Sequence, residues 1–173
     1  MKEDAQFQEQ YARLRNEIAL ACNAQKYEDI VVIADNQGET PSIRKWYVFE
    51  ILCGLGAMEA LQHFIQRVPK AGDWIDDGLV LAAANAHPQL VRFFVSIGAD
   101  VNCYASEAMC FIVEQIGYGQ HCEIMKERLS NLYECAKLLR DAGAKFPDTK
   151  IYSQRPSLQE RIESIIEDIK NAD

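Results

Sequence analysis

The sequence has no long hydrophobic run. No uninterrupted apolar stretch approaches the roughly 20 residues that a helix needs to cross a bilayer. The opening segment, MKEDAQFQEQ, is polar and lacks the apolar core of a signal peptide. These absences argue against a membrane-spanning helix and a secretory signal. We therefore expect a cytoplasmic protein with no membrane partner.

Paired cysteines and an excess of basic residues are also missing. The six cysteines are scattered without a CxxC pair, so we expect free buried thiols and no disulfide framework. Asp and Glu outnumber Lys and Arg by 26 to 18, which gives a net charge of −8. This balance argues against nucleic acid, whose phosphates need a basic face. It favours a protein partner with a basic surface.

The signatures of common catalytic sites are absent as well. The chain has no GxSxG, no HExxH and no P-loop. The glycines of GLGAME, residues 54–59, follow no strand, and we interpret them as a turn between two helices. Carboxylates at Asp76, Asp77 and within 163–168 are interpreted as solvated faces. We expect a protein that is not an enzyme and binds no cofactor and no metal.

Helical periodicity is what the sequence does contain. Its 173 residues, 49% of them hydrophobic, are enough for one domain with a substantial core. Phe7, Tyr11, Leu14, Ile18 and Ala21, for example, recur at steps of three and four and share one helical face. Similar spacing predicts helices over 5–22, 27–35, 45–56, 57–68, a pair within 79–98, 106–117, about 121–142 and 157–170, with a turn-rich connector at 69–78. The expected fold class is all-α.

Two segments end in the same way, which points to an internal repeat. LVRFFVSIGADVN, residues 90–102, is an apolar helix followed by Gly-Ala-Asp. CAKLLRDAGAKF, residues 135–146, is an apolar helix followed by Gly-Ala-Lys. A repeated ending predicts a repeated structural unit.

Residues 76–104 resemble an ankyrin repeat. Within them, LVLAAANAHPQLVRFFVSIGADVN follows the family's order of an alanine-rich first helix, a turn with histidine, an apolar second helix and Gly-Ala-Asp-Val-Asn. Residues 44–70 align with it 30 positions earlier but lack the Gly-Ala-Asp ending. The residues that match in type and spacing are Leu79, Ala82, Ala83, His87, Leu90, Val91, Phe94, Gly98, Ala99, Asp100, Val101 and Asn102.

The resemblance implies an ankyrin-like helical-hairpin solenoid of about three to four degenerate repeats with helical caps. Residues 1–173 would form a single domain, because the helices of one repeat bury their faces only by stacking on neighbours. Its parts would be an N-terminal helical cap at 1–38, repeats at 44–146 and a C-terminal capping helix at 157–171. The last repeat carries about 12 extra residues relative to the family, placed at 118–130. These either add to a binding face or lengthen a helix that packs against 157–170. With caps at both ends we expect a monomer.

Ankyrin arrays bind partners through their finger-like turns and the inner faces of their first helices. On this alignment the finger positions or their bases take three aromatic residues and one acidic residue, and the first helices supply one Glu and one Asn. Trp and Tyr are the residue types that dominate binding hot spots. The alternative is that the two tryptophans simply pack under the cap and over a loop. The expected partner-binding residues are Trp46, Glu50, Trp74, Asp76, Asn85 and Tyr104.

The leading interpretation is a non-enzymatic protein-interaction module. Such a module could be an adaptor, an inhibitor such as an immunity protein, or an effector delivered into a host cell. The alternative is a metal- or thiol-dependent regulator or enzyme that uses the Cys- and His-containing segment 103–135, although the spacings fit no standard zinc motif. A third interpretation is a structural homo-oligomer in which open solenoid ends stack.

Overall fold

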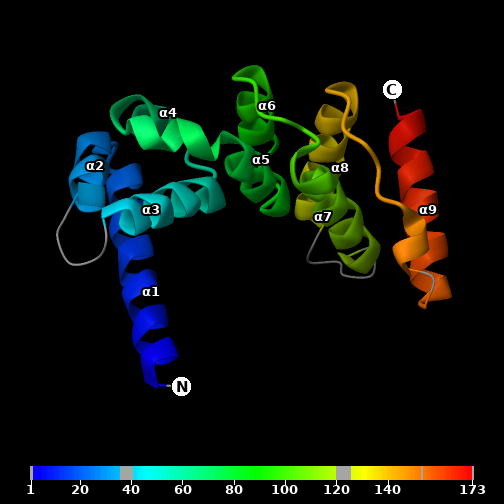
Figure 1. The fold of residues 1–173 in the computed structure, drawn as a ribbon, viewed down its shortest axis with the longest axis horizontal. Coiled ribbons are helices and arrows are strands. Elements are labelled where there is room, and N and C mark those ends of the chain that lie inside the picture. The colour runs from blue at the N-terminus through cyan, green and yellow to red at the C-terminus, as the bar shows by residue number, and fades with distance from the viewer. Residues whose placement is uncertain (1, 36–40, 120–125, 153, 173) are drawn as a thin grey trace. The chain divides into compact units, whose positions relative to one another are not determined.

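The computed structural model describes residues 2–35, 41–119, 126–152 and 154–172. Within these ranges every regular element is a helix and there is no strand, so the all-α prediction is confirmed (Figure 1). None of the described helices combines the length and the apolar character needed to cross a bilayer. The chain forms two compact units, 1–78 and 79–173, which are described separately. One continuous domain over 1–173 stays a prediction.

The first unit consists of two helical hairpins. α1 and α2 form the first hairpin, α3 and α4 form the second, and α3 packs against both helices of the first (Figure 1). A short 3-10 helix, η1, follows and contacts α3 and α4. The bounds are α1 Lys2–Asn23, α2 Tyr27–Asp35, α3 Pro41–Leu55, α4 Met58–Arg67 and η1 Pro69–Trp74.

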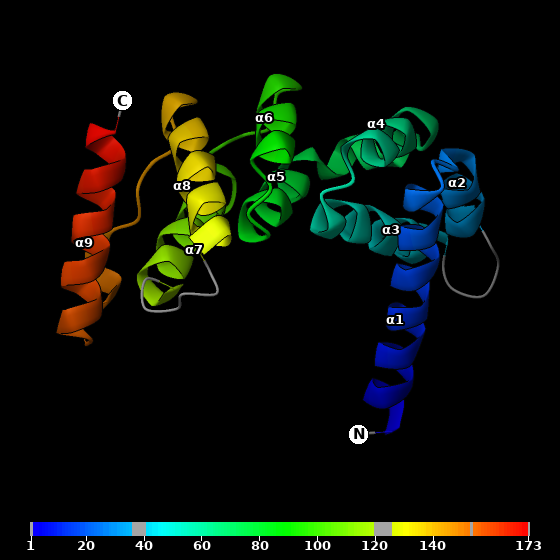
Figure 2. The ribbon, with the colours of Figure 1, turned by 180° about the vertical axis from the view of Figure 1, so that it is seen from behind.

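The second unit contains most of α5 and the helices that follow it. α8 packs against α6 and α7, and α9 packs against α7 and α8 (Figure 2). The bounds are α5 Ile75–Ala84, α6 Pro88–Ser96, α7 Cys103–Gly119, α8 Lys126–Asp141, η3 Thr149–Tyr152 and α9 Pro156–Asn171.

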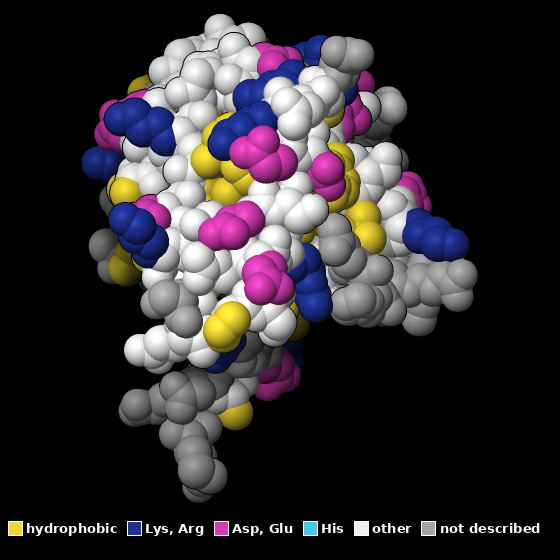
Figure 3. Space-filling view, turned by 90° about the vertical axis from the view of Figure 1, so that its right-hand side faces the viewer, with side chains coloured by type: hydrophobic (Ala, Val, Ile, Leu, Met, Phe, Trp, Pro, Cys, Tyr) yellow, Lys and Arg dark blue, Asp and Glu magenta, His cyan; other side chains and the backbone are white. Residues whose placement is uncertain are grey.

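α9 is amphipathic, as the sequence predicts for a closing helix. Its inner face is buried and consists of Leu158, Ile162, Ile165, Ile166 and Ile169. The face of the molecule on which α9 lies carries acidic and basic side chains among separate hydrophobic ones (Figure 3). A polar outer face is what a terminal helix of a stacked array needs.

The segment 69–78 departs from the sequence-based expectation. The connector predicted at 69–78 is wrong in its second half, because α5 begins at Ile75. Asp76 and Asp77 occupy its first turn, where carboxylates interact favourably with the positive end of the helix dipole. The start predicted near residue 121 for the long helix lies outside the described residues, which resume with α8 at Lys126.

The turns that join the two helices of the first three hairpins share one backbone geometry. Gln25, Gly56 and Ala86 each follow the first helix of a pair and have φ of 55°, 67° and 59°. In each turn two consecutive N–H groups donate to carbonyl groups in the last turn of that helix. The N–H groups of Gln25 and Lys26 donate to the carbonyls of Cys22 and Ala21. Likewise, Gly56 and Ala57 donate to Cys53 and Leu52, and Ala86 and His87 donate to Ala83 and Ala82. This is the Schellman ending of a helix. The turns recur after 31 and 30 residues, close to one repeat length.

Burial repeats with the same period. Ile18, Phe49, Leu79 and Met109 are all fully buried, and each lies on the first helix of its pair. When residues 44–70 are aligned with the segment 30 positions later, buried residues therefore align with buried residues. The period also reaches back to α1 and α2, which the sequence identified only as a cap, because burial is repeated there while residue type is not.

The shared endings at Gly98 and Gly143 are also one repeated turn. Their φ values are 96° and 88°, a region that favours glycine. The next N–H groups, of Ala99 and Ala144, donate to Phe94 and Leu139 at 3.0 and 2.9 Å. Asn102 joins the two endings: its Nδ2 donates to the Gly143 carbonyl at 3.2 Å and its Oδ1 accepts from the Lys145 N–H at 2.8 Å.

The described flanks of the insertion at 118–130 are helical. α7 continues to Gly119, where an added Cβ would lie 3.2 Å from a methyl carbon of Leu129 on α8. Arg161 of α9 donates to the Gly117 carbonyl at 2.8 Å. Neither contact joins a residue of 118–130 to 157–170, so both interpretations of the insertion stay predictions.

Candidate functional site

The structure places four of the six predicted partner-binding residues in the first unit. Trp46 and Glu50 lie on α3, Trp74 ends η1, and Asp76 is in the first turn of α5. The other two lie in the second unit. Asn85 follows α5, where its Nδ2 donates to the Leu81 carbonyl at 2.8 Å. Tyr104 is 60% exposed, which agrees with its expected exposure.

Tyr104 belongs to a strained segment. Tyr104, Ala105 and Ser106 have φ of 48°, 57° and 65°, so three successive residues take the left-handed conformation. Each such residue costs roughly 1–2 kcal/mol. The Ser106 hydroxyl donates to Oδ1 of Asn102 at 2.9 Å, which helps to hold the segment. Here, where the sequence predicts a finger, the chain forms a left-handed helical turn.

The two tryptophans meet. Their ring centroids lie 5.4 Å apart with the rings nearly perpendicular, and both contact Phe49, at 5.9 Å from Trp46 and 5.5 Å from Trp74. Phe49 is fully buried, whereas each tryptophan is half-buried. The pair therefore packs on the core, as the alternative interpretation expects, and still leaves part of each indole in solvent.

A second aromatic cluster lies where α1 crosses α3. The rings of Phe7, Tyr11 and Tyr47 are 5.7 to 6.2 Å apart, and the two tyrosines meet edge to face. Phe7 is 40% exposed and both tyrosines are half-buried. The sequence placed Phe7 and Tyr11 on a core-facing stripe, and it gave no indication that this end of the stripe remains accessible.

Glu50 lies next to both clusters on α3. It follows Trp46 by four residues and Tyr47 by three, the spacings at which helical side chains are neighbours. The Tyr11 hydroxyl donates a hydrogen bond to the Glu50 carboxylate. Burial raises the pKa of Glu50, and this hydrogen bond opposes the rise. Burial and the nearby carboxylate raise the pKa of Tyr11.

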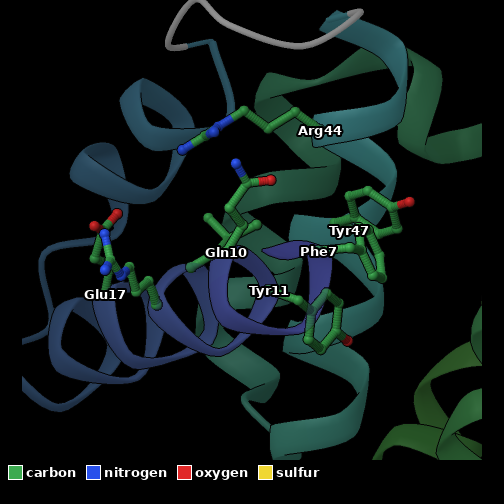
Figure 4. A pocket seen from close by; sticks show the side chains of 8 residues that line it. Phe7, Gln10, Tyr11, Glu17, Arg44 and Tyr47 are labelled. Atoms are coloured by element: carbon green, nitrogen blue, oxygen red, sulfur yellow. The ribbon is translucent and has the colours of Figure 1, made fainter. Parts of the chain in front are cut away.

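A groove of about 270 Å³ runs between α1 and α3 beside this cluster. Gln10 and Arg44 lie on opposite sides of it, with Phe7 beside Tyr47 at one end and Glu17 at the other (Figure 4). Arg44 is anchored, because its Nε donates to the Ile33 carbonyl at 2.7 Å. The groove combines aromatic walls with both signs of charge, a composition suited to a peptide segment.

The thiol and metal alternative finds little support in the residues that the structure describes. They contain no group of three His, Cys, Asp or Glu side chains that could hold a metal ion. Burial raises the pKa of the Cys53 thiol and raises that of Cys135 to about 12, so both stay protonated near pH 7. His121 and Cys122, which the alternative also used, lie outside the described residues.

Comparison of the chain with protein-family models, with curated proteins and with solved structures found no match.

Proposed function

We propose that the protein is a non-enzymatic, ankyrin-like protein-binding module that holds its partner on the first helices of its first two hairpins. The binding surface, here called the α1–α3 surface, consists of Phe7, Tyr11, Trp46, Tyr47 and Glu50. The observation that carries the proposal is this group of partly exposed aromatic side chains on α1 and α3, of which Tyr11 is hydrogen-bonded to Glu50.

The repeated geometry supports the ankyrin-like part of the proposal. Three hairpins share one turn at intervals of 31 and 30 residues, and two second helices end in the same glycine turn. Asn102 connects consecutive endings, as expected for repeats that stack. In the family that the sequence resembles, the inner faces of first helices bind partners, and α1 and α3 are both first helices.

The chemistry of the α1–α3 surface supports the binding part. Aromatic side chains bury a large area on association and lose few rotamers, which is why they dominate hot spots. A ring that is already half-buried is held in place before binding, so less conformational entropy is lost. The excess of acidic residues in the chain favours a partner with a basic surface. An adaptor, an inhibitor, an immunity protein and an effector would all share this mode of binding.

The test is affinity capture from the source cells with the wild type and two double variants. Phe7→Ser with Tyr47→Ser alters the α1–α3 surface. Leu20→Ser with Val32→Ser is the matched control, because these side chains are also hydrophobic and are 69% and 60% exposed. We expect a stoichiometric partner with the wild type and the control, and its loss with the surface variant. Equal capture by both folded variants would contradict the proposal.

A further inference from the structure

Glu50 is a partly buried carboxylate on α3. It forms no ion pair with any residue that the structure describes, and the hydrogen bond from Tyr11 is its identified polar contact. By contrast, Glu28 and Asp35 in the same unit pair with Arg67 and Lys45 at 3.0 and 2.7 Å. Removing part of the water around a carboxylate costs free energy unless an opposite charge compensates.

Aromatic residues lie near Glu50. Trp46 and Tyr47 precede it by about one turn of α3, and Tyr11 of α1 donates a hydrogen bond to it. The face of an aromatic ring attracts a cation, with Trp the strongest, and the attraction grows when the site is partly desolvated. A carboxylate among aromatic rings is therefore a site for a cationic side chain, which gains from both interactions.

The arginines of the adjacent groove do not provide this charge. Arg44 donates to the Ile33 carbonyl, and Arg13 pairs with Glu9 on its own helix. The charge of Arg15 lowers the pKa of Tyr11, but Arg15 is not an identified partner of Glu50. None of these arginines is therefore an identified ion-pair partner of Glu50, so a cation of a bound molecule can pair with it.

We propose that Glu50, with Trp46, Tyr11 and Tyr47, forms a pocket for a lysine or arginine side chain presented by the protein partner. This inference rests on the proposed function, because it names the group on the partner that the α1–α3 surface recognises. The Glu50 carboxylate pairs with the cation, and the rings contact its methylene stem and its charged head.

The experiment titrates the full chain with N-acetyl-arginine amide and N-acetyl-lysine amide, each compared with the neutral N-acetyl-norleucine amide at equal ionic strength. The chain has two tryptophans, so its two indole N–H signals in NMR report on Trp46 and Trp74 separately once Trp46→Phe has assigned them. We expect a saturable shift of the Trp46 signal with the two cationic amides and a much smaller one with the neutral amide.

Glu50→Gln supplies the decisive variant, since glutamine keeps an acceptor for Tyr11 but removes the charge. We expect it to weaken binding of the cationic amides by roughly two- to fivefold, the upper part of the range for an exposed charge pair. Glu59→Gln is the matched control, because Glu59 also accepts a hydrogen bond from a tyrosine, Tyr27, at 2.7 Å. It should bind like the wild type.

Two results would overturn the inference. One is equal shifts with the norleucine amide, and the other is unchanged affinity in Glu50→Gln. Partner capture separates this failure from failure of the proposed function. If Phe7→Ser with Tyr47→Ser loses the partner while Glu50→Gln keeps it fully, the α1–α3 surface binds the partner but the cation pocket is wrong.

Discussion

At the scale of single residues, Glu50 is a proposed binding group that is unfavourable for the fold that carries it. Burial raises its pKa, and its hydrogen bond from Tyr11 compensates only in part. An acid whose folded-state pKa lies above its unfolded value makes the folded state less stable once it ionises. That cost is removed when pH falls, or when a bound cation compensates the charge.

Glu50→Gln should therefore stabilise the free protein at pH 7 and lose this advantage near pH 4. The unperturbed pKa is 4.5, so at low pH Glu50 becomes protonated in both states and no longer differs from glutamine in charge. Its titratable neighbours Tyr11 and Cys53 have raised pKa values and stay protonated over this range. Urea unfolding of both proteins at the two pH values measures the difference. A less stable Glu50→Gln at pH 7 would reveal a cation that already pairs with Glu50.

The cysteines make a second prediction at this scale. Cys53 and Cys135 are fully buried and their thiols have raised pKa values, so thiolate is scarce and access is blocked. In the native protein, both should react with a thiol-specific reagent only as fast as the fold opens. Peptide mass spectrometry after timed labelling, with a denatured sample as reference, measures this rate. Rapid labelling of Cys135 would revive the thiol-dependent alternative.

At the scale of elements, one turn geometry ends several helices although the residues differ. Gln25, Gly56 and Ala86 all take positive φ in the same hydrogen-bonding pattern. Only the turn at Gly56 has a glycine at this position, the residue that takes positive φ without a steric penalty. The turn is therefore fixed by how two helices pack within a hairpin, and the glycine is helpful but not required.

Gly98→Ala should separate backbone strain from packing. A Cβ at Gly98 meets no atom within 4 Å, so the cost comes from φ of 96° alone, roughly 1–2 kcal/mol in the free energy of unfolding. Gly54→Ala is the control: its Cβ also meets nothing, but Gly54 lies inside α3, where alanine is favoured by up to about 1 kcal/mol. Chemical denaturation should show that Gly98→Ala lowers the free energy of unfolding and that Gly54→Ala raises it. The same sign for both would contradict this account of the turn.

At the scale of the whole molecule, helical hairpins provide the core and also the surface on which we propose that a partner binds. Each hairpin buries one side and presents the other, so the residues left accessible on consecutive first helices can act together. In the first unit, α1 and α3 do this with the aromatic residues around Glu50. The second unit ends in α9, whose apolar face is buried against its neighbours.

The expected monomer is a prediction at this scale. A chain with net charge −8 repels its copies at low ionic strength, and α9 presents no apolar stripe to a further helix. Light scattering coupled to size exclusion should give a mass near 19.6 kDa at micromolar concentration. A dimer that Leu20→Ser with Val32→Ser converts to monomer would instead favour the structural homo-oligomer.

The helices and the repeated ending could be predicted because they follow from local chemistry. Steps of three and four place apolar residues on one face of a helix, and Gly98 and Gly143 suit a left-handed ending. The candidate site was predicted only in part. Trp46 and Glu50 were chosen through the resemblance. Phe7 and Tyr11 were missed as surface residues because an apolar stripe normally indicates core, and no pattern singled out Tyr47.

The sequence by itself determined the all-helical class, the positions of most helices and the turn that two of them share. Only the tertiary structure decided which aromatic rings remain accessible and which carboxylate they surround. Periodicity reports the face of a helix, but exposure depends on where a neighbouring helix stops. α1 has 22 residues and α2 has nine, so the first turns of α1 have no cover from their own hairpin and place Phe7 and Tyr11 against α3.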